Sequence, residues 1–203
     1  MKRRTVPLVA GLRPADKTDV DWIAAQQAQV YADHDAIPRH ILQEWFAANP
    51  YAFNIICDRH GARVGHLNII PVKATTLQML LEGKIREKEV RGDSIYSAAE
   101  RDAVSCLWIE SIAVDVSNPY RRARALLNVF EGAHGALERL AEPAKLTNFY
   151  SLSATRAGAN LIKRFGFQLA AGGNHRTDGL DLYCATYEVI RRKTDELLVA
   201  RRC

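Results

Sequence analysis

The chain has 203 residues, of which 48% are hydrophobic and 25% are charged, and its formal net charge is +5. This length suits one well-filled core, and the composition is ordinary for a globular protein. No apolar run approaches the roughly 18 residues that span a bilayer. The N-terminal apolar run is too short for a signal peptide, so we expect a cytoplasmic protein. The positive charge suits an anionic ligand, but its dispersal argues against nucleic acid as a partner.

Neither the cysteines nor the histidines form a metal-ligand or disulfide pattern. Four cysteines are scattered along the chain without a C-x-x-C pair: Cys57, Cys106, Cys184 and Cys203. Three of them fall in apolar, strand-like runs, where cysteine usually acts as a small buried hydrophobe. His34 and His40 lie six residues apart and on either side of an expected helix boundary. We therefore expect no disulfide framework and no metal site.

The first half of the chain predicts a strand, two helices and a hairpin. Residues 7–13 are typical of a short strand, and a helix follows in which Thr18 and Asp21 would form a capping box. A second helix opens at Pro38 and is stopped by Asn49-Pro50. Two β-rich runs then flank "DRHG" at 58–61, which is a hairpin turn signal.

The segment 73–102 reads as an insert that crosses the surface and is not a separate domain. It holds one expected short helix at 76–81 and a second near 97–101, separated by a charged stretch. The run 103–116 that follows is apolar and rich in β-branched residues, which is typical of a strand buried on both faces.

The second half alternates helices and strands. A long helix begins in "NPYRRARALLNVF" (118–130) and runs to Pro143, and "KLTNFYSLSA" is another strand. Thr155 would cap the next helix, which ends with Gly166 at its C′ position. The run 181–190 predicts a last strand, and 191–203 predicts a short helical tail. The order mixes hairpins with crossovers, so we expect an α/β (α+β) fold with a mixed sheet flanked by helices.

Three stretches in this order resemble the GNAT superfamily of acyl-CoA-dependent N-acyltransferases. "WIESIAVDV" running into "NPYRRARALLNVF" is similar to the family's central strand, pyrophosphate loop and following helix. "SATRAGANLIKRFGF" resembles its late helix ending in a Gly-Phe turn, and "GHLNIIPV" belongs to the early hairpin. The resemblance covers roughly residues 8–190. It implies one domain over 1–203, a mostly antiparallel sheet, and a V-shaped opening that holds the pantetheine arm of the cosubstrate acetyl-CoA or another acyl-CoA.

The resemblance also implies which residues hold that cosubstrate. The backbone of Ile112, Ala113 and Val114 would bond the pantetheine, and Thr155 would contact the cofactor arm. The family's loop usually reads [Q/R]-x-x-G-x-[G/A], and its amides wrap the pyrophosphate at a helix N-terminus. The matching stretch here carries arginine and leucine where the family has glycine or another small residue: Arg121, Arg122, Ala123, Arg124, Ala125 and Leu126.

Two interpretations of this arginine-rich helix start remain open. The positive end of the helix dipole disfavours cations by about 0.3–1 kcal/mol each, so phosphates would turn a penalty into a gain through charge-assisted contacts. Alternatively, Asn118 is the N-cap, Pro119 occupies the first helical position, and the arginines are simply solvated.

Glu110 is the candidate catalytic base, because a glutamate inside "LWIESIAV" is costly to bury without a reason. Many family members place a carboxylate at a similar point. The alternative is that Glu110 faces solvent or pairs with an arginine. The family's acid is a tyrosine four residues before the glycine of the late helix, but that position is Ile162 here. Tyr150 and Ser153 are nearby in sequence and fit ordinary strand residues equally well.

The sequence therefore predicts an acyl-CoA-dependent N-acyltransferase that works by direct transfer to a small-molecule or peptide amine. The alternative is a non-catalytic protein of the same fold that binds CoA, another anionic ligand or a partner protein. The insert is expected to overhang the acceptor side. The sheet-edge strands near the C-terminus would allow a homodimer.

Overall fold

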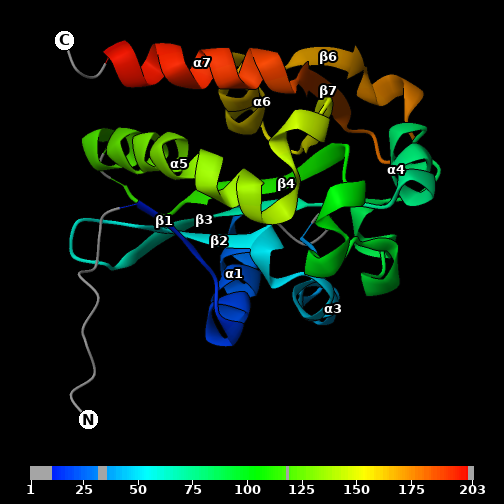
Figure 1. Cartoon of the computed structure of the whole chain (residues 1–203), viewed down its shortest axis with the longest axis horizontal. Helices are drawn as coiled ribbons and strands as arrows, with labels where there is room; N and C mark the ends of the chain where they lie inside the picture. Colours follow the sequence, from blue (N-terminus) through cyan, green and yellow to red (C-terminus); the bar gives the residue numbers. More distant parts are fainter. Residues whose placement is uncertain (1–10, 32–35, 118, 201–203) are drawn as a thin grey trace.

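The computed structural model describes residues 11–31, 36–117 and 119–200, and its centre is one seven-stranded sheet (Figure 1). The strand order is β1-β2-β3-β4-β5-β7-β6. Every neighbouring pair is antiparallel except β4 and β5, which are parallel. The mixed, mostly antiparallel sheet predicted from the sequence is confirmed. The strand bounds are β1 (Gly11–Pro14), β2 (Phe53–Cys57), β3 (Arg63–Ile70), β4 (Cys106–Val114), β5 (Asn148–Ser153), β6 (Gln168–Ala171) and β7 (Asp181–Thr186).

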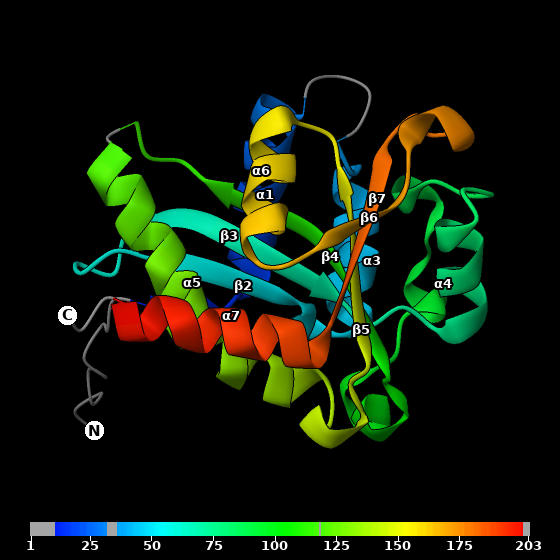
Figure 2. The ribbon, with the colours of Figure 1, turned by 90° about the horizontal axis from the view of Figure 1, so that it is seen from above.

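Helices cover both faces of the sheet. On one face lie α1 (Lys17–Val30) and α3 (Arg39–Ala48), and on the other lie α5 (Pro119–Leu140) and α6 (Arg156–Arg164) (Figure 1). The last helix, α7 (Tyr187–Ala200), crosses on the outer side of α5, as the view from above shows (Figure 2). The buried core includes large side chains from both layers, such as Ile23, Trp45, Phe53, Trp108 and Phe149.

The insert between β3 and β4 forms α4 (Ala74–Leu81) and three 3₁₀ turns, at Glu87–Glu89, Gly92–Ser94 and Ala98–Ala103. Two of the contacts that hold it are buried. The buried indole of Trp45 donates to the Val90 carbonyl at 3.0 Å. The Arg176 guanidinium, paired with Asp178 at 2.6 Å, donates to the carbonyls of Leu80 and Leu81, both at 2.9 Å. The second contact satisfies the Leu81 carbonyl, which the end of α4 leaves open, and adds a second donor to the Leu80 carbonyl, which also accepts from the Gly83 amide at 3.0 Å.

Three local predictions need correction. The N-cap of α1 is Asp16, which forms a capping box with Asp19, so the predicted box of Thr18 and Asp21 is wrong. β7 ends at Thr186 and α7 starts at Tyr187, so the predicted strand is too long and the helical tail begins earlier. The four-residue edge strand β6 was not predicted, because its exposed "QLAA" carries no alternating pattern. The expected N-cap Asn118, His34, Cys203 and residues 7–10 lie outside the described residues.

Two glycines of α5 make a matched test of how this helix packs on β1. A Cβ on Gly132 would lie 2.3 Å from the Leu12 Cβ, whereas a Cβ on Gly135 would have only the Arg139 Nη1 at 3.7 Å as a neighbour within 4 Å. We expect Gly132→Ala to lower the free energy of unfolding by about 1–3 kcal/mol, because the helix must move off the strand. Gly135→Ala should raise it by up to about 1 kcal/mol through helix propensity. Urea unfolding measures both, and equal effects would contradict this packing.

Candidate active site

The sheet opens where β4 and β5 part. Their parallel register holds only at Cys106, Leu107 and Trp108 of β4. At the next position the Ser151 hydroxyl donates to the Ile109 carbonyl at 2.9 Å, and beyond it the strands diverge. Among the described residues, the edge of β4 that faces β5 therefore has no strand partner from Glu110 to Val114. Such backbone groups need other hydrogen-bond partners, and a ligand with amide groups can supply them.

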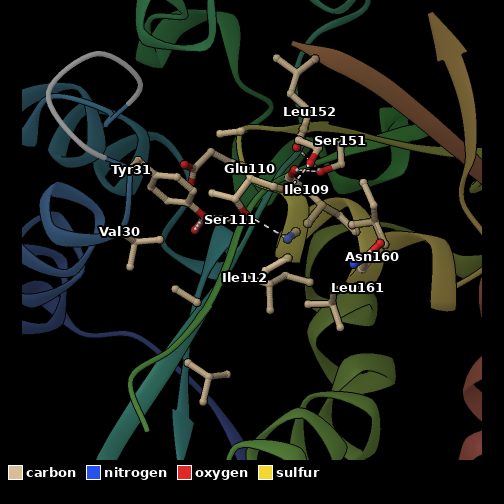
Figure 3. Close-up of a pocket in the computed structure, with 18 of the residues that line it drawn as sticks. Val30, Tyr31, Ile109, Glu110, Ser111, Ile112, Ser151, Leu152, Asn160 and Leu161 are labelled. Atoms are coloured by element: carbon tan, nitrogen blue, oxygen red, sulfur yellow. Dashed lines mark hydrogen bonds between the residues drawn. The ribbon is translucent and has the colours of Figure 1, made fainter. Parts of the chain in front are cut away.

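A cavity of about 490 Å³ fills this opening. It is lined by β4 on one side, by β5 and the first turns of α6 on the other, and by the end of α1, as Figure 3 shows. Arg122 and Leu126 of α5 also line it, and Glu87 reaches it from the insert. Within the described residues no cluster of His, Cys, Asp or Glu is arranged to hold a metal ion.

A β-bulge sets the direction of Glu110. The register between β3 and β4 runs from Asn68↔Ser111 directly to Ile69↔Ile109, so Glu110 is the extra residue on β4. A bulge leaves one residue unpaired and re-aims its side chain. As a result Glu110 and Ser111, which a regular strand would place on opposite faces, both line the cavity.

The carboxyl group of Glu110 is held by two amides. Gln27 Nε2 donates to both of its oxygens at 3.0 Å, and Asn68 Nδ2 donates to Oε2 at 2.9 Å. Burial disfavours the charged form and outweighs these hydrogen bonds, which favour it, so the pKa of Glu110 is raised to about 7. A carboxyl group that titrates near neutral pH can take up and release a proton under ordinary conditions.

The hydroxyl of Tyr31 lies beside this carboxyl group. It is 2.9 Å from the Ser111 Oγ, which in turn lies 3.0 Å from Nε2 of the buried His66 (Figure 3 shows Tyr31, Glu110 and Ser111). Burial and the charge of Glu110 raise the pKa of Tyr31 far above its ordinary value, so its hydroxyl stays protonated. Burial lowers the pKa of His66 to about 4, so its ring is neutral at neutral pH.

Six of the residues expected to hold a cosubstrate line the cavity: Ile112, Ala113, Val114, Arg122, Leu126 and Thr155. Arg122 is exposed and donates from Nε to the Val116 carbonyl at 3.0 Å. Thr155 caps α6, as predicted, by accepting from the Gly158 amide at 3.0 Å. Thr155 therefore both caps α6 and lines the cavity.

The other loop residues lie elsewhere. Ala123 and Arg124 are exposed and are not among the lining residues, and Ala125 is buried against the core. Arg121 lies in the first turn of α5, and its side chain lies outside the described part. Ile162, at the family's tyrosine position, is 5% exposed and lines the cavity with an apolar surface.

Solved structures of the same fold match nearly the whole chain, whereas no family model and no curated protein matches the sequence. The loading GNATL domain of CurA from Lyngbya majuscula has a TM-score of 0.59 at 11% identity, over 88% of this chain and 98% of that one. The GNAT-like decarboxylase GphF, solved with isobutyryl-CoA, has a TM-score of 0.57 at 16% identity, over 87% and 98%. The GNAT-family N-acetyltransferase YhbS from Escherichia coli, solved with CoA, has a TM-score of 0.53 at 14% identity, over 93% and 88%.

The chain therefore has the GNAT fold, as the resemblance of its motifs predicted. None of the described helices is long and apolar enough to cross a bilayer. At these identities the comparison establishes the fold alone, and one fold hosts several chemistries.

The sequence did not point to the polar residues around Glu110. Gln27 lies in the first expected helix and Asn68 in the hairpin run "GHLNIIPV", and neither was named as a candidate site residue. A glutamine in an apolar stripe and an asparagine between apolar neighbours are both signals of a buried polar contact. Ser111 and His66 carry no such signal, because the bulge that places Ser111 is not visible in the sequence.

Proposed function

We propose that this protein is an acyl-CoA-dependent N-acyltransferase that moves an acyl group, in the simplest case acetyl, directly from CoA to an amine. The observation that carries this proposal is Glu110. Its carboxyl group has a pKa of about 7 and lines the cavity at the point where the two central strands part. A base of this strength suits removal of a proton from an ammonium group.

The cavity also suits the pantetheine arm of the cosubstrate. The arm has two amide groups, and no described strand pairs with the edge of β4 from Glu110 to Val114 on this side. Thr155 and Gly158 line the opposite wall. At the phosphates the sequence departs from the family's pattern, because Arg124 and Leu126 stand where the family has small residues. Arg122 and the backbone amides of the first turn of α5 would hold the phosphates here.

In the proposed reaction Glu110, directly or through a water molecule, takes one proton from the acceptor ammonium. The free amine attacks the thioester carbon, the carbon–nitrogen bond forms, and the carbonyl electron pair moves to oxygen. The carbon–sulfur bond then breaks with its electrons on sulfur. The thiolate takes the remaining nitrogen proton through solvent, and a thiol is acidic enough to leave in this way. The products are the amide, the CoA thiol and a proton.

Calorimetric titration with acetyl-CoA, followed by thiol release in the presence of a panel of primary amines, tests this function. We expect saturable 1:1 binding and release that depends on the amine. Binding without release with any amine would favour the non-catalytic protein of this fold, which the exposed Arg124 and the apolar Ile162 support.

Arg122→Ala tests the phosphate contact separately. One charge-assisted contact contributes about 1.5–3 kcal/mol when buried, and Arg122 is exposed, so we expect acetyl-CoA to bind roughly 3- to 10-fold more weakly. Arg101→Ala removes the same charge from an exposed arginine of the insert that does not line the cavity, and it should bind like wild type. Equal affinities of all three proteins would contradict the assignment.

A further inference from the structure

A row of three hydrogen-bonded side chains leads from the cavity beside Glu110 into the buried core. Tyr31 comes from the end of α1, Ser111 from β4 and His66 from β3. The Tyr31 Oη lies 2.9 Å from the Ser111 Oγ, and the Ser111 Oγ lies 3.0 Å from the His66 Nε2. Ser111 is 3% exposed and His66 is fully buried, whereas Tyr31 lines the cavity together with Glu110 (Figure 3).

The protonation of His66, at the buried end of this row of side chains, determines which atom donates in each hydrogen bond. A neutral imidazole has one N–H group, on either Nδ1 or Nε2. The His66 Nδ1 has no hydrogen-bond partner among the described residues. A buried N–H left without an acceptor is costly and rare, so the proton belongs on Nε2, which then donates to the Ser111 Oγ.

The direction of the His66 hydrogen bond determines the direction of the next one, between Ser111 and Tyr31. Among the described residues, the Ser111 Oγ has two side-chain hydrogen-bond partners, His66 and Tyr31. Because His66 donates to it, the buried Ser111 hydroxyl satisfies its own proton only by donating to the Tyr31 oxygen. The Tyr31 oxygen is then an acceptor on its Ser111 side, which leaves its own O–H available to an acceptor in the cavity that Tyr31 lines.

We propose that Tyr31 is a catalytic residue whose hydroxyl donates a hydrogen bond to the thioester oxygen in the transition state, with Ser111 and His66 as positioning residues. This role rests on the acyl-transfer function proposed above. When the amine attacks, the carbonyl electron pair moves to oxygen, and the Tyr31 O–H stabilises that oxyanion without giving up its proton. The oxyanion then collapses and the electron pair leaves on sulfur. A donor that is fixed before the reaction needs no reorganisation when the charge develops.

The high pKa of Tyr31 agrees with this role, because a hydroxyl that stays protonated remains a donor throughout the reaction. It agrees less well with transfer of the proton to a thiolate, which is a much weaker base. The assignment also gives a polar partner to the acyl group at a site where Ile162 offers only an apolar surface.

Tyr31→Phe removes the hydroxyl and little else. We expect kcat for thiol release to fall about 10²- to 10³-fold, which is the cost of losing one oxyanion donor, while the Kd for acetyl-CoA changes less than 2-fold. Tyr150→Phe is the matched control: Tyr150 lies on β5 and does not line the cavity, and its variant should keep the wild-type kcat. A Tyr31→Phe protein that binds acetyl-CoA and keeps more than half of kcat would overturn the proposal.

A second measurement decides the direction of these hydrogen bonds without any turnover. The ¹⁵N chemical shifts of the His66 ring should show a protonated Nε2 and an unprotonated Nδ1 at neutral pH. The opposite tautomer would reverse the donor and acceptor roles of Tyr31, Ser111 and His66. It would overturn the role of Tyr31 but leave the proposed function standing. Failure of wild type to bind acetyl-CoA or to release thiol would instead contradict the function itself, and the role of Tyr31 with it.

Discussion

Glu110→Gln is expected to lower kcat for amine-dependent thiol release by about 10²- to 10⁴-fold, which is the usual contribution of a positioned base. Acetyl-CoA should still bind with a Kd within 2-fold of wild type, because the expected contacts of the cosubstrate on β4 are to the backbone. Glutamine also suits the site. Gln27 Oε1 and Asn68 Oδ1 have no hydrogen-bond partner among the described residues. An amide at 110 can donate to one of them when that neighbouring amide rotates by half a turn, because its nitrogen faces residue 110 in the wild type.

The pH dependence gives a second readout of the same variant. The pKa of Glu110 is raised to about 7, so kcat/KM of the wild type should rise with pH through that value as the base loses its proton. Glu110→Gln should lose this limb. An unchanged kcat, or a limb that survives in the variant, would remove Glu110 from the role of base.

The free energy of unfolding of the wild type should fall with rising pH over the range in which kcat/KM rises. The folded protein holds the Glu110 proton more tightly than the unfolded chain, so this group contributes stability at low pH and loses it as pH rises from about 4.5 to about 7. Glu110→Gln is free of this loss and should be the more stable protein above pH 7, by at most about 3 kcal/mol. The lowered pKa of His66 makes stability rise with pH instead, but it does so in both proteins. The difference in stability between wild type and Glu110→Gln therefore does not contain the effect of His66.

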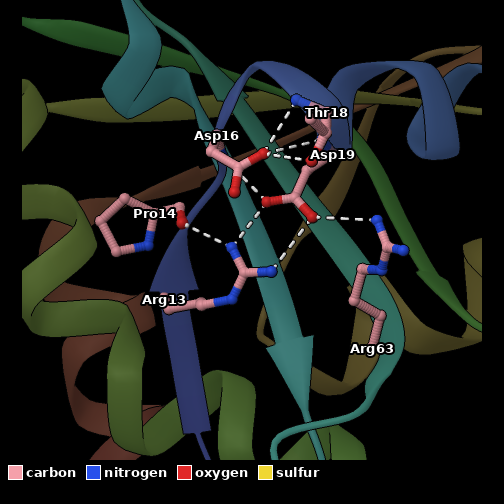
Figure 4. Close-up of polar contacts among 6 residues, drawn as sticks. All are labelled: Arg13, Pro14, Asp16, Thr18, Asp19 and Arg63. Carbon is pink, nitrogen blue, oxygen red and sulfur yellow. Dashed lines mark hydrogen bonds and ion pairs between the residues drawn. The ribbon is translucent and has the colours of Figure 1, made fainter. Parts of the chain in front are cut away.

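Asp19→Asn is expected to lower the free energy of unfolding by about 2–4 kcal/mol. The Asp19 side chain is 2% exposed and pairs with Arg13 at 2.6 Å and with Arg63 at 3.2 Å (Figure 4). It also accepts from the Asp16 amide at 2.8 Å, which closes the capping box of α1. Removing one partner of a buried pair typically costs about 3–5 kcal/mol, and the two arginines here are 38% and 40% exposed, which reduces the loss.

Asp21→Asn is the matched control for that variant. Asp21 lies two residues further on the same helix and pairs with Arg39 at 2.7 Å, but both side chains are largely exposed. Its loss should not measurably change the urea midpoint. Burial acts to raise the pKa of Asp19, yet the bonds from Arg13 and Asp16 hold it below its ordinary value. The advantage of wild type over Asp19→Asn should therefore disappear as pH falls below about 4. Equal midpoints for both variants at pH 7 would contradict this account.

Much of the fold was predictable because each element has a strong local signal. Asn49-Pro50 ends α3 as predicted, Thr155 caps α6, and Gly166 with φ +89° follows the C-cap of that helix. The hairpin at "DRHG" also forms between β2 and β3. The parts that were missed have weak or competing signals: Asp16, Thr18 and Asp21 are all good caps.

The candidate site was less predictable, because it depends on contacts between distant segments. Glu110 stood out as a carboxyl group in an apolar strand, but its partners come from residues 27 and 68. The bulge that brings Ser111 to the cavity depends on the register with β3, which no local pattern specifies. The arginines at the start of α5 take different places: Arg122 lines the cavity, whereas Arg124 is exposed and is not among the lining residues.

The position of CoA in a co-crystal structure tests the central claim most directly. We predict the pantetheine between β4 and β5 with its amides bonded to the backbone between Glu110 and Val114, the pyrophosphate at the start of α5 near Arg122, and the sulfur beside Glu110 and Tyr31. CoA bound outside the cavity, or a crystal soaked at millimolar CoA with water alone between the strands, would contradict it.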